Sequence, residues 1–465
     1  MVIKLFIGRE SELELLEKKY SENRFNLFIV YGRRRVGKTT LLKKFCENKP
    51  SIFFVGEENN DKLSLQGFSK AVFEYYNLSK TIDSFGDWEK ALTFVAEKAT
   101  DHQLVLVLDE FPFLVRANPS LPSLLQNLID HQLKNTKLFL ILCGSSMSFM
   151  EKEVLSYKSP LYGRRTGSIL LESFGFYDSE KFFPQYSKEE RFKAYSILGG
   201  VPQYLDCFNS SIPLAENIKA QILRKGSLLY NEPRFFTMQE FRNPAIYNSI
   251  IETVADGYTR LNEIASKIGE KPDKTAKYMT SLLDLKIVER LQPVGHTKKS
   301  RKSIYRIKDH FFRFYYRFIT KYFSLLEQEM IDHVYHQLIS PRLSGFFGQS
   351  FEDVCREYLI HENKALKLPL VFNEIGSWWG NNPIKKQEEE IDILAVEEGQ
   401  CIVAECKWRD KKTGMDVFNR LIEKSRLLPY EETFYYLFSR SGFEEALLQE
   451  ATSNGRLTLV AFQNM

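Results

Sequence analysis

The segment from Gly32 to Thr39 constrains the fold of this chain more than any other part of the sequence. It reads Gly-Arg-Arg-Arg-Val-Gly-Lys-Thr and matches the pattern G-x-x-x-x-G-K-[S/T]. An apolar run at 26–31 precedes it and predicts a β-strand, and the run from Thr40 to Asn48 predicts a helix. The alternative is a chance glycine-rich turn, but such a turn would not have to lie between a strand and a helix. The order of strand, loop and helix therefore favours a phosphate-binding loop.

The residues of this loop have complementary roles in holding a nucleoside triphosphate. Glycines let backbone N–H groups curl around the phosphates, and the N-terminus of the following helix favours negative charge. We expect Lys38 to reach the β and γ phosphates and the Thr39 hydroxyl to ligate Mg²⁺. ATP and Mg²⁺ are thus the expected cofactors, with these nucleotide-binding candidates: Gly32, Arg33, Arg34, Arg35, Val36, Gly37, Lys38, Thr39 and Thr40.

Two acids follow a second apolar strand. The run from Leu104 to Leu108 is entirely apolar and leads into Asp109 and Glu110. Open α/β sheets have their ligand sites at the carboxyl ends of strands. We therefore expect Asp109 to hold Mg²⁺ through water and Glu110 to orient the attacking water. Taken alone, such acids are usually a solvated strand end, but a phosphate-binding loop upstream favours the catalytic interpretation.

The apolar runs also predict how the chain divides into domains. Runs at 51–55 and 138–142 are continuous rather than alternating, which is typical of a parallel sheet covered by helices on both faces. A chain of 465 residues exceeds what one core usually organises. We predict an α/β protein with four parts: a phosphate-binding-loop domain at 1–165, a helical lid at 166–238, a winged helix with a linker helix at 239–325, and a second α/β domain at 340–465.

The winged-helix prediction rests on two helical runs, at 259–268 and 273–285, followed by strands on either side of a basic loop. That loop, 296–302, carries four cations within five residues and would be the wing. Such charges can track the phosphate backbone of DNA. A rigid connector with a solvated loop is the equal alternative, so DNA is one of two expected roles.

A third group of candidate residues lies near the C-terminus. Two predicted strands carry Asp392 and the sequence Glu405-Cys406-Lys407, with twelve residues between the aspartate and the glutamate. Because side chains alternate along a strand, Glu405 and Lys407 share one face. Asp392 and Glu405 would jointly ligate Mg²⁺, and Lys407 would position or activate a water. The alternative is a surface ion pair at a strand end.

This spacing resembles the core of the PD-(D/E)XK nucleases. Glu352, which opens a predicted helix ahead of the strands, resembles the first-helix acid of that superfamily and joins Asp392 and Glu405 as a metal-ligand candidate. The resemblance implies a restriction-endonuclease-like α/β domain. Two alternatives remain open: the domain cleaves nucleic acid, or it keeps the fold without the activity. A fold does not by itself determine a function.

Four further segments, at 6–10, 142–146, 161–165 and 200–202, resemble the archaeal-type AAA+ ATPases, which are related to the signalling STAND group. The resemblance extends over most of the chain. It implies an AAA+ fold with a helical lid and a C-terminal extension, and ATP hydrolysis as the activity.

The same resemblance implies roles around the nucleotide. Arg9 lies in the opening segment that borders the adenine, and Pro202 lies in the element that closes the lid over it. Ser145 or Ser146 would sense the γ-phosphate, where many AAA+ proteins have an asparagine.

Arg164 would be the arginine finger of this family, which acts on the nucleotide of a neighbouring subunit. A second copy of the chain or another protein is therefore an expected partner. A surface salt bridge is an equal alternative for Arg164, and Arg165 offers the same charge next to it.

Composition narrows the class of protein. The net charge is only +4, so the whole chain is not a polycation, and the six cysteines form no CxxC pair, which is typical of a reducing compartment. No stretch approaches ~18 uncharged apolar residues, so we expect no membrane span and a cytoplasmic protein. Two functions remain: an ATP-driven enzyme that acts on DNA with a Mg²⁺-dependent nuclease-like domain, and a regulatory switch whose C-terminal domain only binds a partner.

Overall fold

The computed structural model describes residues 6–78, 84–295 and 303–465. Its chain divides into two compact units. The first unit comprises residues 1–174 with 201–203, and the second comprises 175–200 with 204–465. The predicted wing at 296–302 lies outside the described residues. Among the helices that are described, none has both the length and the apolar character that crossing a membrane requires.

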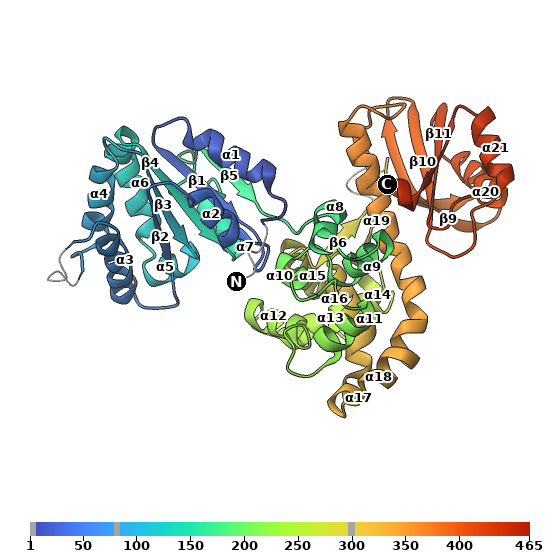
Figure 1. The fold of residues 1–465 in the computed structure, drawn as a ribbon, viewed down its shortest axis with the longest axis horizontal. Helices are drawn as coiled ribbons and strands as arrows, with labels where there is room; N and C mark the ends of the chain where they lie inside the picture. The colour runs from blue at the N-terminus through green and yellow to red at the C-terminus, as the bar shows by residue number, and fades with distance from the viewer. Residues whose placement is uncertain (1–5, 79–83, 296–302) are drawn as a thin grey trace. The chain divides into compact units, whose positions relative to one another are not determined.

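A five-stranded sheet forms the centre of the first unit (Figure 1). The strand order is β2-β3-β4-β1-β5 and every neighbouring pair is parallel. The strands are β1 (Asn26–Tyr31), β2 (Ser51–Val55), β3 (Leu104–Asp109), β4 (Leu138–Gly144) and β5 (Gly167–Leu170). The helices are α1 (Glu10–Tyr20), α2 (Lys38–Cys46), α3 (Asp61–Tyr75), α4 (Trp88–Lys98), α5 (Phe111–Ala117), α6 (Leu121–His131) and α7 (Met147–Phe149). The predicted parallel α/β sheet is confirmed.

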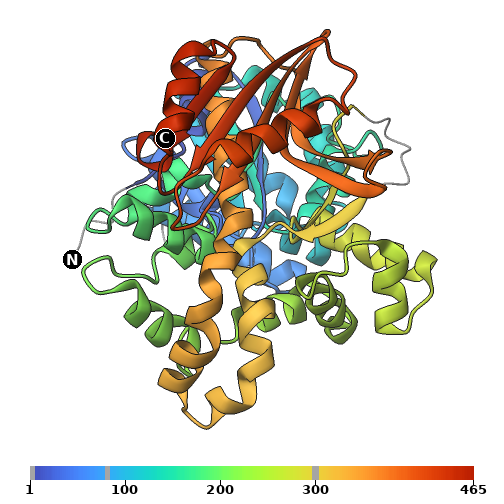
Figure 2. The same cartoon turned by 90° about the vertical axis from the view of Figure 1, so that its right-hand side faces the viewer.

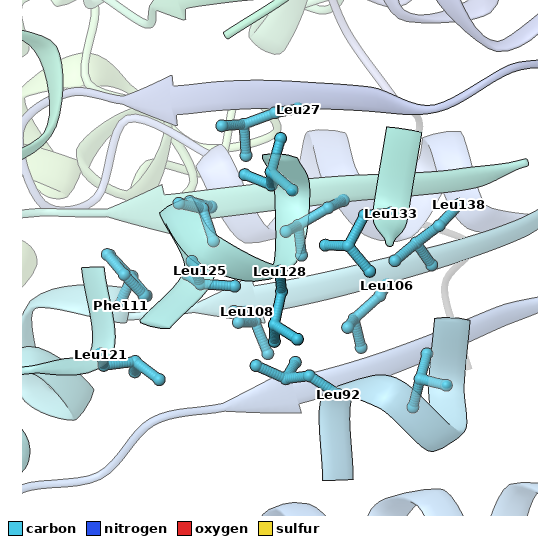
Figure 3. Packing of buried hydrophobic residues seen from close by; sticks show 14 of the residues in the cluster. Leu27, Leu92, Leu106, Leu108, Phe111, Leu121, Leu125, Leu128, Leu133 and Leu138 are labelled. Carbon is cyan, nitrogen blue, oxygen red and sulfur yellow. The ribbon is translucent and has the colours of Figure 1, made fainter. Parts of the chain in front are cut away.

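Alternation along the strands divides the core between the two faces of this sheet. Leu27 and Ile29 of β1 belong to one cluster of buried residues, and Phe28 and Val30 belong to another. Figure 3 shows the first cluster, in which leucines of β3 and α6 pack together. Burying one such side chain contributes about 1.5–3 kcal/mol. Both faces must therefore be covered, which explains why the strands are apolar throughout.

The second unit begins with short helices and a winged helix. The first helices are α8 (Phe176–Ser179), α9 (Lys188–Leu198), α11 (Leu214–Ile218) and α12 (Glu232–Glu240), together with α10 (Pro202–Leu205), whose first two residues belong to the first unit. They are followed by α13 (Pro244–Ala255), α14 (Leu261–Ile268), α15 (Pro272–Asp284) and the antiparallel strands β6 (Val288–Leu291) and β7 (Ile304–Ile307). Gly269 ends α14 with φ 72°, a left-handed conformation that suits glycine and makes the turn into α15.

An aromatic helix continues from the winged helix. Helix α16 (His310–Phe314) runs on as a π-helical turn, Tyr315–Ile319, and Phe311, Phe312 and Phe314 are fully buried. Burial explains the aromatic run as packing rather than as an exposed platform for bases. The short helices α17 (Phe323–Glu327) and α18 (Ile331–His333) follow.

A second five-stranded sheet, β12-β11-β10-β9-β8, forms the C-terminal part (Figure 2). Its elements are α19 (Leu343–Lys364), β8 (Glu374–Asn382), β9 (Gln387–Glu397), β10 (Gln400–Lys407), α20 (Met415–Ser425), β11 (Glu432–Ser439), α21 (Glu445–Ser453) and β12 (Leu457–Ala461). Strands β8, β9 and β10 pair antiparallel, and β10, β11 and β12 pair parallel. The domain boundaries predicted near 239 and 340 fall inside the second unit and remain a prediction.

Candidate functional site

The loop between β1 and α2 has a backbone conformation that most residue types avoid. Gly32, Arg35 and Gly37 have φ of 153°, 71° and 91°, and Gly37 is the N-cap of α2. A Cβ at Gly32 would lie 2.2 Å from the carbonyl oxygen of Leu171. The two motif glycines are therefore needed for the shape of the loop.

Lys38 lies inside this loop. Its Nζ donates to the carbonyl oxygens of Gly32 at 2.9 Å and Arg33 at 3.0 Å. Lys38 is only 6% exposed, and this burial lowers the pKa of its ammonium group. An ammonium that already bonds to two carbonyls can exchange them for phosphate oxygens, which carry full negative charge.

The other candidates of the loop lie around Lys38. Arg34 is near enough to lower the pKa of Lys38 by charge repulsion. Arg33 and Val36 are buried, Arg34 and Arg35 are half-buried, and Thr39 and Thr40 are exposed on the first turn of α2.

Thr39 meets the acids that follow β3. Its hydroxyl donates to Oδ2 of Asp109 at 2.7 Å, and the backbone N–H of Glu110 donates to Oδ1 of Asp109 at 2.9 Å. A hydroxyl and a carboxylate that lie next to each other are oxygen ligands of the kind that Mg²⁺ prefers. Thr39 and Asp109 therefore fit a Mg²⁺ ion beside the phosphates.

Glu110 is held by Ser145, which follows β4. The Ser145 hydroxyl donates to Oε2 of Glu110 at 2.8 Å, and its backbone N–H lies 3.4 Å from the same oxygen. The strand order explains this contact, because β4 lies between β1 and β3 and brings Ser145 between the loop and the acids. Ser146 has no such contact with Glu110.

Two structural features at this edge were not predicted from the sequence: the role of Gly56 and the backbone conformation of Glu110. Gly56, just after β2, donates its backbone N–H to the carbonyl oxygen of Asp109 at 2.8 Å. A Cβ at Gly56 would lie 3.0 Å from the Glu110 carbonyl oxygen and from the side chain of Leu114, so a larger residue would crowd this edge. Glu110 itself has φ 51°, a conformation rare outside glycine, which sets the direction of its side chain. Neither feature has a sequence pattern that would have revealed it.

Arg9 and Pro202 both lie beside the loop in the first unit. Arg9 donates to the carbonyl oxygens of Val36, at 3.2 Å, and Glu172. Its guanidinium stacks 4.2 Å from the ring centre of Phe174. A Cβ at Gly37 would lie 3.8 Å from the ring of Pro202. The expectation that both residues border the nucleotide remains a prediction, and the contacts with the loop are compatible with it.

Arg164 is paired within its own chain. Its guanidinium makes three hydrogen bonds to Asp130 of α6: Nε donates to both carboxylate oxygens at 3.1 Å, and Nη2 donates to Oδ2 at 2.6 Å. Arg164, together with Lys134, lowers the pKa of the Asp130 carboxyl to about 2. This partner escaped the sequence analysis, because 34 residues separate the two. The salt bridge predicted as the alternative to a finger is present, and Arg164 must leave Asp130 to reach a nucleotide elsewhere.

The C-terminal candidates come together where β9 and β10 end their pairing. Ile393 pairs with Ala404, and the next residues along the ladder are Asp392 and Glu405. Oδ2 of Asp392 accepts the backbone N–H of Cys406 at 2.8 Å. Burial and the nearby Glu405 raise the pKa of Asp392, whereas burial and the nearby Asp392 raise the pKa of Glu352 in α19. The three acids therefore interact.

Lysines neutralise Glu405. Its Oε1 accepts from Lys407 at 2.5 Å, as the shared strand face predicts, and its Oε2 accepts from Lys424 of α20 at 3.0 Å. Among the described residues, no three His, Cys, Asp or Glu side chains are close enough together to hold a metal ion. Because both oxygens of Glu405 are already bonded, a Mg²⁺ ion held by these acids would have to displace Lys407 or Lys424.

Fold and site together define the class of protein. The parallel sheet, the loop at Gly32–Thr39 and the acids at its edge are those of a P-loop ATPase of the AAA+ type. Residues 6–208 match a family described as "ATPase domain predominantly from Archaea", and residues 315–417 match archaeal and bacterial proteins of unknown function.

Comparison with known proteins gives the family. An uncharacterized protein of Methanocaldococcus jannaschii is 34% identical over 432 residues, which are 92% of this chain and 93% of that protein. The chain therefore belongs to the same family as this relative, and its archaeal-type ATPase domain makes it an ATPase. A Walker-type ATPase of Pyrococcus abyssi shares the fold: it is 19% identical, with a TM-score of 0.50 over 67% of this chain and 96% of that one.

Proposed function

We propose that this ATPase couples ATP turnover to action on DNA, through its winged helix and a nuclease-like C-terminal domain. Asp392, Glu405 and Lys407 at the junction of β9 and β10, with Glu352 on the preceding helix, carry the proposal. The order of helix, three antiparallel strands, helix and parallel strand from α19 to β11 supports it, because this is the order expected of a nuclease-like core.

Exposed lysines support DNA contact by the winged helix. Lys267 of α14 and Lys271, Lys274 and Lys277 around α15 are all exposed. Lys274 is paired with Glu270 at 2.8 Å. Cations on the second helix of such a motif suit the phosphates that flank a DNA groove.

Salt dependence of DNA binding tests this contact. We expect Lys277→Ala to weaken binding of duplex DNA and to reduce the slope of log K against log salt by about 1, because one phosphate contact is lost. Lys62→Ala, an exposed lysine of α3 in the first unit, is the matched control. Equal slopes for wild type and Lys277→Ala would exclude α15 from the interface.

Cleavage is tested by incubating the full chain with linear, circular and single-stranded DNA, with and without ATP and Mg²⁺. Cleavage that requires Mg²⁺ and disappears in Asp392→Asn, while ATP turnover persists, is the expected result. No cleavage of any substrate by wild type under any of these conditions would refute the nuclease.

A regulatory switch is the second candidate function, and Glu405 is the observation that favours it. Two lysines bond both oxygens of Glu405, so a metal ion has to displace at least one of them. If that displacement does not occur, the C-terminal domain binds DNA or a protein without cutting. DNA binding that depends on ATP, with no cleavage, would support this second candidate.

A further inference from the structure

A second lysine, Lys424, reaches the C-terminal acids from helix α20. Its Nζ donates to Oε2 of Glu405 at 3.0 Å. Val417 and Leu421 of the same helix are buried and belong to the hydrophobic core of the C-terminal sheet. Lys424 comes one turn after Leu421, so it continues the face of the helix that packs against the sheet. Such a helix normally has its charged residues on the opposite face, and the position of Lys424 therefore calls for an explanation.

Lys424 lies among several acids rather than beside one. Burial raises the pKa of Glu390, and the charge of Lys424 opposes this shift. Burial and Glu405 raise the pKa of Asp392, and Lys424 is among the groups that oppose them. The ammonium of Lys424 therefore occupies a place where three carboxyl groups favour a cation.

Both lysines that bond to Glu405 can be reached from solvent. The side chain of Glu405 is 11% exposed, and those of Lys407 and Lys424 are 24% and 18% exposed. Lys407 comes from the same strand face as Glu405 and makes the shorter bond, 2.5 Å against 3.0 Å for Lys424. Lys424 instead reaches Glu405 from a separate helix, along a flexible stem. A cation that competes for Glu405 would therefore displace Lys424 more readily than Lys407.

We propose that Lys424 takes the place of the metal ion while no Mg²⁺ is bound, and that it binds a DNA phosphate once Mg²⁺ has displaced it. Without Mg²⁺, the ammonium of Lys424 offsets the repulsion among the carboxylates. Once its oxygen of Glu405 is taken by Mg²⁺, the ammonium needs another anion, and a phosphate is a strong partner for it. Mg²⁺ and DNA therefore strengthen each other's binding at this site. The inference rests on the proposed action on DNA and adds a device that disfavours Mg²⁺ binding until DNA is present.

Calorimetric titration of Mg²⁺ into the full chain, without nucleotide or DNA, tests the first half of this device. The binding that Asp392→Asn removes is assigned to the C-terminal site. We expect Lys424→Met, which keeps the apolar stem, to bind Mg²⁺ at this site about tenfold more tightly than wild type, because the competing ammonium is gone. Arg420→Met, which removes an exposed cation of the same helix, is the matched control and should bind as wild type does.

The outcomes separate this inference from the proposed function. Equal Mg²⁺ affinities of wild type and Lys424→Met would overturn the inference and leave the metal site standing. The absence of Asp392-dependent Mg²⁺ binding in both proteins would overturn the two together. Thermal unfolding establishes whether Lys424→Met folds, and Lys424→Gln, which keeps a hydrogen-bond donor for Glu405, replaces it with the same expected result if it does not. Lys424→Arg retains the cation and should bind Mg²⁺ as weakly as wild type.

Binding of a short labelled DNA duplex tests the second half of the device. Fluorescence anisotropy is read at early times after mixing, so that cleavage does not contribute, with and without Mg²⁺ at constant ionic strength. Mg²⁺ should tighten DNA binding by wild type about tenfold, and this gain should be at least about threefold smaller in Lys424→Met. An equal gain in the two proteins would show that the displaced ammonium does not bind a phosphate and would overturn the proposed coupling.

Discussion

At the scale of single residues, the nucleotide site depends on a few side chains whose positions the backbone fixes. Lys38 is enclosed by the carbonyls of its own loop, and Thr39 reaches Asp109 across the sheet edge. The motif alone determined these expectations, because its glycines permit only a narrow set of loop shapes. The bond between Ser145 and Glu110 could not be predicted, because it depends on side-chain conformation and on β4 lying between β1 and β3.

Lys38→Ala should abolish tight ATP binding, because it removes the ammonium that the loop directs at the β and γ phosphates. Fluorescence titration with a labelled ATP analogue measures this directly. Lys43→Ala, an exposed lysine on the same helix α2, should bind as wild type does. Retained submicromolar affinity in Lys38→Ala would mean that the phosphates bind elsewhere.

At the scale of elements, an ion-pair network joins the winged helix, the aromatic helix and α19. Asp353 of α19 bonds to Arg306 of β7 at 2.6 Å and to Arg356 at 3.3 Å, and it lies 3.6 Å from His310 of α16. Arg306 above all lowers the pKa of Asp353 far below its usual value, against the opposing effect of burial. Hydrophobic patterns predicted these elements well, but no pattern predicts a pair 47 residues apart.

Asp353→Asn should lower the free energy of unfolding at pH 7 by about 3 kcal/mol, because it leaves Arg306 with one carboxylate fewer. The depressed folded-state pKa means that the aspartate stabilises above the unfolded pKa, about 3.9, and that this contribution fades as pH falls toward the folded value. Urea unfolding should therefore show that the free energies of unfolding of wild type and Asp353→Asn approach each other as the pH falls from 7 to 3.

The control for this element is Asp416→Asn, which removes a carboxylate from the exposed surface pair with Arg420. It should change stability little at any pH. A constant difference between wild type and Asp353→Asn down to pH 3 would show that the charge of Asp353 is not the cause.

At the scale of the whole molecule, the two sheets predicted from apolar runs are both present, and the aromatic helix packs within the second unit. Sequence reasoning succeeded where burial fixes periodicity, as in β3 and α15. It did not predict that Lys424 bonds to Glu405 at the C-terminal acids, because Lys424 comes from a helix whose position no local pattern specifies.

If Arg164 is a finger supplied to a neighbouring copy, ATP turnover per chain should rise with protein concentration, and Arg164→Ala should lose about 10³-fold in rate with little change in nucleotide affinity. Arg165→Ala, next along the chain, is the matched control. Turnover that stays flat from nanomolar to tens of micromolar, in protein that is monomeric throughout, would rule out a trans-acting finger and leave Arg164 as the partner of Asp130.

We infer that ATP is hydrolysed at the edge of the first sheet where Thr39, Asp109 and Glu110 meet. Single-turnover hydrolysis of bound ATP by Glu110→Gln tests it most directly, with the exposed Glu153→Gln as control. We predict that Glu110→Gln binds ATP as tightly as wild type but hydrolyses it about 10²-fold more slowly or worse, because the group that orients the water is lost. Hydrolysis by Glu110→Gln at the wild-type rate would contradict the claim.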